Sequence, residues 1–103
     1  MMEYTGKQKS YLKSVANGLD AIVKMGGKGV TENLIKALDE ALTAHELVKV
    51  SSFERDRDAR TSAARALAEG TQSQLIAILG RTMLFYRENP DHPTVSKSLN
   101  KIK

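Results

Sequence analysis

The first half of the chain shows helical apolar spacing interrupted by one short apolar run. The first helical stripe consists of Leu12, Val15, Ala16 and Leu19. Thr5 and Gln8 precede it at the spacing of a capping box, which places the helix start at residue 5 or 6. Residues 21–25 (AIVKM) are short and apolar and predict a strand. A second helix is predicted after Thr31 as N-cap. Its apolar face contains Leu34, Leu38, Ala41, Leu42 and His45.

The second half predicts two strands that form a hairpin after a third helix. Residues 46–51 read as a strand, and the charged segment 52–58 leads into the helix. The helix has a thin stripe of Ala59, Ala63, Ala66 and Leu67, and Gly70 is its expected stop. Segments 74–79 and 82–87 are strands separated by Gly80-Arg81, a two-residue loop that suits a type II′ turn.

The predicted order is helix, strand, helix, strand, helix, strand, strand. Strands that alternate with helices and end in a hairpin favour an α/β (α+β) two-layer fold, with a four-stranded mixed sheet packed with helices. Asn89-Pro90 is expected to end a domain that spans residues 1–90. Residues 91–103 lack strong periodicity and are predicted to be a basic flexible tail.

Composition excludes several classes of protein. The 103 residues suit one domain, and the absence of cysteine excludes a disulfide framework and a thiolate metal site. No apolar run is long enough to span a membrane or to form a signal peptide, so we expect a cytoplasmic protein without a membrane partner. The two histidines are far apart, and no acid–base or metal-ligating constellation is visible. We therefore expect no catalytic residue, metal, cofactor or small-molecule substrate.

The charge of the chain is positive and unevenly distributed. Sixteen Lys and Arg against twelve Asp and Glu give a net charge of +4. Residues 1–30 hold five of the lysines and only two acidic residues, whereas residues 31–50 are net acidic. The five N-terminal lysines are Lys7, Lys9, Lys13, Lys24 and Lys28. A basic segment of this kind favours a polyanionic partner.

The sequence Gly26-Gly27-Lys28-Gly29 stands between a predicted strand and a predicted helix. Glycines let the backbone approach an anion, and the amides and dipole of the following helix favour negative charge. A Walker-type loop is excluded because Gly29 and Val30 follow the lysine, and a dinucleotide fingerprint is excluded because Glu32 replaces the last glycine. The remaining G-x-x-G pattern is used to clamp single-stranded RNA backbone, but it is equally consistent with a tight turn that binds nothing.

Three separated motifs give the chain a family resemblance. They are Thr5-Gly6-Lys7-Gln8, the segment 25–33 (MGGKGVTEN), and Leu79-Gly80-Arg81-Thr82 followed by Tyr86-Arg87. In this order they resemble the CRM domain (chloroplast RNA splicing and ribosome maturation), and most closely its bacterial stand-alone YhbY-like form, over about residues 4–90. The resemblance implies a fold similar to the C-terminal domain of bacterial translation initiation factor three.

The resemblance also implies a function and a set of contact residues. It implies an RNA-binding protein, not an enzyme, whose partners are ribosomal RNA and precursors of the large ribosomal subunit and which assists ribosome assembly. The implied backbone clamp consists of Gly26, Gly27, Lys28 and Gly29, and the implied phosphate contacts on the first helix are Lys7, Lys9 and Lys13. Lys24 and Arg81, which lie beside the loop and at the hairpin tip, complete the predicted RNA-binding set. The alternative is a protein–protein adaptor of the assembly machinery without direct RNA contact.

Overall fold

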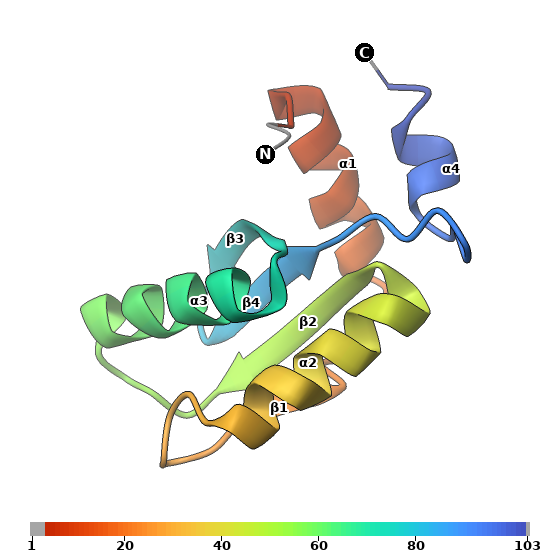
Figure 1. The fold of residues 1–103 in the computed structure, drawn as a ribbon. Helices are drawn as coiled ribbons and strands as arrows, with labels where there is room; N and C mark the ends of the chain where they lie inside the picture. The colour runs from red at the N-terminus through yellow and green to blue at the C-terminus, as the bar shows by residue number, and fades with distance from the viewer. Residues whose placement is uncertain (1–3, 103) are drawn as a thin grey trace.

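The computed structural model describes residues 4–102 and has the predicted elements in the predicted order (Figure 1). Its elements are α1 (Gly6–Ala16), β1 (Val23–Met25), α2 (Glu32–His45), β2 (Leu47–Ser52), α3 (Arg57–Thr71), β3 (Gln74–Leu79), β4 (Thr82–Tyr86) and α4 (Ser96–Leu99). The strands form one sheet in the order β1-β2-β4-β3. β1 and β2 are parallel and β4 is antiparallel to both of its neighbours, which confirms a four-stranded mixed sheet.

One face of the sheet carries the larger hydrophobic core, beneath α2 and α3. β2 contributes Val48 and Val50 to it, and β4 contributes Met83 and Phe85, because every second residue of a strand points to the same face. Leu34, Leu38 and Leu42 of α2 are buried against them at helical spacing, as predicted, whereas His45 is exposed.

The other face of the sheet carries a second, smaller core beneath α1 and α4. Leu12 and Ala16 of α1 pack there with Leu84 and Tyr86 of β4 and with Leu99 of α4. The sheet therefore has helices on both faces, so the layering goes beyond the expected two layers. Within residues 4–102, Lys24 on this face is exposed and Ser51 and Thr82 are half-buried, and we call the part of the face around them the open face.

Local sequence signals account for most of the helix ends. The Thr5–Gln8 capping box is complete: the Gln8 amide donates to Thr5 Oγ1 at 3.2 Å and the Thr5 amide to Gln8 Oε1 at 2.9 Å. The predicted stop at Gly70 is wrong, because α3 continues to Thr71. Gly70 serves close helix packing instead, since a Cβ there would lie 3.1 Å from Ile35 Cδ1 of α2.

The prediction of a flexible tail fails for residues 91–102. This segment forms α4 and buries Ser96 and Leu99 against the second face of the sheet. The anchor is Glu46, which is fully buried at the C-terminal end of α2. Its carboxylate accepts hydrogen bonds from three backbone amides of the C-terminal segment: Asn89 (2.7 Å), Thr94 (2.6 Å) and Ser96 (2.9 Å).

Burial opposes ionisation of the Glu46 carboxyl group, but these amides outweigh burial. The amides of Ser96, Asn89 and Thr94 lower the pKa of Glu46 to about 2. Glu46 also holds a backbone φ of +66°, which is unfavourable for a residue with a side chain. A charged side chain in strained backbone thus holds residues 89–96 in place.

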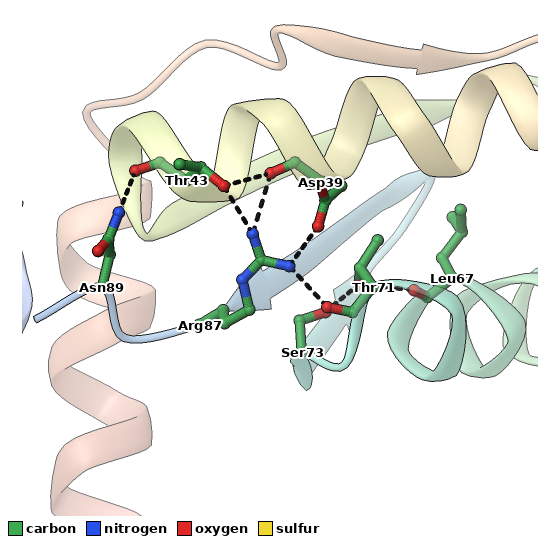
Figure 2. A network of polar contacts seen from close by, with 7 residues as sticks. All are labelled: Asp39, Thr43, Leu67, Thr71, Ser73, Arg87 and Asn89. Atoms are coloured by element: carbon green, nitrogen blue, oxygen red, sulfur yellow. Dashed lines mark hydrogen bonds and ion pairs between the residues drawn. The ribbon is translucent and has the colours of Figure 1, made fainter. Parts of the chain in front are cut away.

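Arg87 ties the end of β4 to both helices of the larger core, as Figure 2 shows. Its guanidinium donates to the carboxylate of Asp39 at 2.6 Å, to Thr43 Oγ1 at 2.9 Å and to the carbonyl of Thr71 at 2.6 Å. A planar group with several donors suits such a junction. The arginine that belongs to the third sequence motif therefore has a structural role.

Candidate nucleic-acid interface

Three loops meet at one end of the sheet, which we call the loop end: residues 26–31, residues 53–56 and Gly80-Arg81. Met25, the last residue of β1, pairs with Ser52, the last residue of β2, and the Ser52 amide donates to the carbonyl of Arg81 at 2.9 Å. α2 and α3 begin at this end (Figure 1). Ligand sites of open α/β sheets form at the carboxyl ends of parallel strands, which is where these loops lie.

The segment Gly26–Gly29 forms an exposed tight turn. The Gly29 amide donates to the Gly26 carbonyl at 3.1 Å, and Gly29 has a φ of +71° that favours glycine. The turn therefore uses the Gly29 amide, which is not available to a ligand. The amides of Gly27 and Lys28 have no hydrogen-bond acceptor within residues 4–102. Gly27 and Lys28 are both exposed, and a Cβ at Gly27 would meet nothing within 4 Å, so a ligand can approach this part of the turn.

The start of α2 adds further donors beside this turn. Thr31 Oγ1 accepts the amide of Leu34 at 3.1 Å, while the amides of Glu32 and Asn33 have no partner within the helix. A shallow hollow of about 440 Å³ runs along the edge of β1 between the turn and α2. Its lining includes the residues of the glycine turn and Thr31 and Asn33 at the start of α2.

Three of the predicted cations lie at or near the loop end. Lys28 and Arg81 are exposed at two of its loops, and neither forms an ion pair within the described residues. Lys24 is exposed on the open face of the sheet, because its neighbours Val23 and Met25 are buried on the face beneath α2. Positive charge and free amides thus lie together.

Acidic side chains lie at the same end, but two of them have structural partners. Asp56 accepts the Asp58 amide at 3.1 Å as the N-cap of α3, and Glu54 accepts the Asp56 amide at 3.0 Å. Glu32 lies in the first turn of α2, where it favours the helix dipole. The loop end is therefore mixed in charge, with its positive part around Lys28, Arg81 and Lys24.

The structure does not bring the lysines of α1 to the loop end. Lys7, Lys9 and Lys13 lie on α1, which packs over the second, smaller core and against α4. In Figure 1 the N-terminal part of α1 lies at the top, far from the loop that joins β1 to α2. Lys7 and Lys13 are exposed and Lys9 is half-buried. Lys9 and Lys13 lie one turn apart on α1 and form a second basic surface, whereas Lys7 points to the opposite side of the helix.

Phe53 is a residue of the loop end that the sequence analysis missed. Its side chain is 71% exposed, directly after the buried Ser52. An aromatic residue inside a charged connection was the available signal, but only the strand register reveals which loops surround it.

None of the helices described here is long and apolar enough to cross a membrane. Across residues 4–102, no group of three or more His, Cys, Asp or Glu side chains is placed to hold a metal ion.

The chain is similar to known proteins in sequence and in fold. Residues 4–87 match the CRS1/YhbY (CRM) domain family. The chain is 40% identical over 91 residues to a Bacillus subtilis protein named "Probable RNA-binding protein YqeI", covering 88% of this chain and 95% of that protein. It is 31% identical over 91 residues to a Haemophilus influenzae protein named "RNA-binding protein", covering 88% of this chain and 92% of the relative.

A solved structure is similar in fold. The solution structure of a Staphylococcus aureus protein, described as a candidate RNA-binding protein, has a TM-score of 0.75 and 39% sequence identity. The match covers 84% of this chain and 91% of the other chain.

Proposed function

We propose, from the premise that this chain belongs to the CRS1/YhbY (CRM) domain family, that it binds RNA through the loop end of its sheet. The observation that carries the proposal is the open Gly26–Gly29 turn, where two free amides and the side chain of Lys28 lie beside the start of α2. Amides and lysines bind phosphate oxygens without reading base identity. We therefore expect binding that is mainly electrostatic and nearly independent of sequence.

The proposed target is ribosomal RNA in precursors of the large ribosomal subunit, whose assembly the protein would assist. The support is the family, whose members matched here are named as RNA-binding proteins, together with the resemblance to ribosome-maturation proteins. Gly26, Gly27, Lys28 and Gly29 would form the clamp, with Gly26 and Gly29 shaping the turn. Lys24 and Arg81 would add charge beside it, and the lysines of α1 would contact phosphates elsewhere on the same RNA.

Sedimentation of a cell lysate on a sucrose gradient, followed by crosslinking, tests the function. We expect the protein to sediment with large-subunit precursors and to crosslink directly to their RNA. A protein–protein adaptor would instead remain bound to proteins of the assembly machinery after nuclease treatment and at high salt. Migration at the top of the gradient, without crosslinks, would exclude a role in assembly.

Replacing Lys28 with alanine is expected to weaken RNA binding and to reduce its salt dependence. If three to five phosphates are neutralised, the slope of log K against log salt should be about −2 to −4 for the wild type, and smaller in magnitude by about 0.7 to 0.9 for the variant. Titrations of ribosomal RNA at several salt concentrations measure the slope. Arg65→Ala, near the middle of α3 on the opposite face of the sheet from α1, removes the same charge away from both basic surfaces and should leave the slope nearly unchanged.

The two basic surfaces are expected to contribute independently. Lys9→Ala/Lys13→Ala and Lys28→Ala remove charges from separate regions, so the losses in binding free energy should add within ~0.5 kcal/mol in the triple variant. Titration of the same RNA with the three variants measures this. Unchanged binding of the Lys9→Ala/Lys13→Ala variant would remove the α1 surface from the interface.

A further inference from the structure

Among the large apolar side chains of residues 4–102, Phe53 has the largest exposed fraction, 71% against 57% for Ile22, 46% for Leu79 and 37% for Leu19. It belongs to neither hydrophobic core cluster. Burial of a phenylalanine ring stabilises a fold, and a ring that stays mostly exposed contributes little of this stabilisation. The exposure of Phe53 at this position therefore favours a role in binding.

The backbone around Phe53 is held in a fixed position. On its N-terminal side, Ser52 is paired with Met25 of β1 and donates its amide to Arg81. On its C-terminal side, the Glu54 amide donates to Ser52 Oγ at 3.0 Å. The ring is thus carried by an anchored residue between the strand that leads into the glycine turn and the hairpin tip that carries Arg81.

The surroundings of Phe53 favour a nucleobase over an apolar protein surface. The row across the open face of the sheet at this end consists of Lys24, Ser51, Thr82 and Leu79. Two hydroxyl side chains and a lysine therefore make up most of this row, and Leu79 stands at its far end on β3. A lone aromatic ring among polar and charged groups does not form the continuous apolar patch that is typical of a protein docking surface. It suits a flat base attached to a charged backbone.

We propose that Phe53 is a stacking platform for one unpaired RNA base, next to a phosphate held by the Gly26–Gly29 turn. The proposal rests on the proposed function and adds to it a preference for single-stranded over duplex RNA. Every base has a π-face, so the preference does not depend on sequence. The ring adds a base contact to a site otherwise built for phosphate.

The first experiment compares Phe53→Leu with the wild type on three probes of equal length: single-stranded oligo(A), an abasic ribose–phosphate oligomer and an RNA duplex. Phe53→Leu keeps an apolar side chain without the aromatic face. We expect it to weaken binding of oligo(A) by about fivefold or more and to leave binding of the abasic oligomer and the duplex within twofold. Unchanged thermal unfolding of the variant shows that the fold is intact, as expected for an exposed side chain.

The second experiment uses the absence of tryptophan from the chain. Phe53→Trp should bind oligo(A) at least as tightly as the wild type, and the emission of its single tryptophan should be quenched by oligo(A) but not by the abasic oligomer. His92→Trp, at an exposed position beside the C-terminal end of α2 and away from the loop end, should show no such change.

The outcomes separate the stacking proposal from the proposed function. If the wild type binds no RNA, the proposed function fails. If binding depends on Lys28 but Phe53→Leu binds oligo(A) as the wild type does, and Phe53→Trp emission is unchanged, the loop end holds phosphate and Phe53 does not stack. If Phe53→Leu weakened the binding of oligo(A) and of the abasic oligomer equally, the stacking proposal would likewise be overturned.

Discussion

Replacing Glu46 with glutamine is expected to lower the free energy of unfolding at pH 7 by about 3 kcal/mol and to loosen the C-terminal segment. The carboxylate accepts three backbone amides in a fully buried site, and each hydrogen bond to a charged acceptor contributes more than a neutral one. An amide group offers one acceptor oxygen and turns an NH₂ toward donors. Urea unfolding measures the loss, and hydrogen exchange at residues 94–99 should rise. Glu40→Gln, on the exposed side of α2, is the control and should change stability by less than ~0.5 kcal/mol.

The pH dependence of stability provides an independent check on Glu46. The pKa of Glu46 is about 2 in the folded chain, below its ordinary value of 4.5, so ionisation stabilises the fold above pH 4.5. This contribution is lost as the pH falls from 4.5 through 2. The stability difference between wild type and Glu46→Gln should therefore shrink over this window. A difference that stays constant from pH 7 to pH 2 would mean that the charge of Glu46 does not anchor the segment.

Signals confined to a few neighbouring residues predicted most of the fold. The Thr5–Gln8 capping box, the Thr31 cap and the turn at Gly80 each require only local geometry, and Gly80 has the positive φ (+62°) that a type II′ turn needs there. The apolar face of α2 could be predicted because three leucines recur at helical spacing. These features depend on residues that are close together in the sequence and not on contacts with distant parts of the chain.

The errors lie where a residue depends on a distant partner. The segment after residue 90 is ordered by the carboxylate of Glu46, which is 50 positions before Ser96 in the sequence. Its own apolar pattern is too short to indicate a helix. Gly70 was interpreted as a helix stop because the approach of Ile35 from α2 leaves no trace in the local sequence. Position 66 was predicted to be buried, but the packing direction of α3 buries Ala64 instead.

The candidate site likewise combines features that single residues predict with features that depend on contacts between distant parts of the chain. The glycine turn and its lysine could be read from the sequence, because conformational freedom and charge are properties of single residues. The use of the Gly29 amide by the turn, the distance between α1 and the loop end, and the position of Phe53 beside that end all depend on strand register and helix placement. Sequence reasoning supplied the components of a phosphate site, and the fold decides which of them can act together.

A negative charge at Gly27 is expected to cause the largest loss of RNA binding among changes at the loop end. Gly27 has no positive φ, and a side chain there would enter open space, so Gly27→Asp should fold normally. Its carboxylate would stand beside the free amides where we place the phosphate. Two like charges about 4 Å apart repel by about 1 kcal/mol in water and by more near a protein surface, so affinity should fall by about tenfold at low salt.

Gly27→Asn separates charge from bulk in this experiment. Asparagine has nearly the same size and shape as aspartate but no charge, so the neutral variant should bind within about threefold of the wild type. The gap between the two variants should close as salt is raised, because screening weakens the repulsion at a solvent-exposed position. Gly29 is a poorer position for the test, since its φ of +71° would strain any side chain and confound binding with folding. If Gly27→Asp and Gly27→Asn bind ribosomal RNA equally well at low salt, the phosphate is not held at this turn. The α1 lysines would then be the main electrostatic contact.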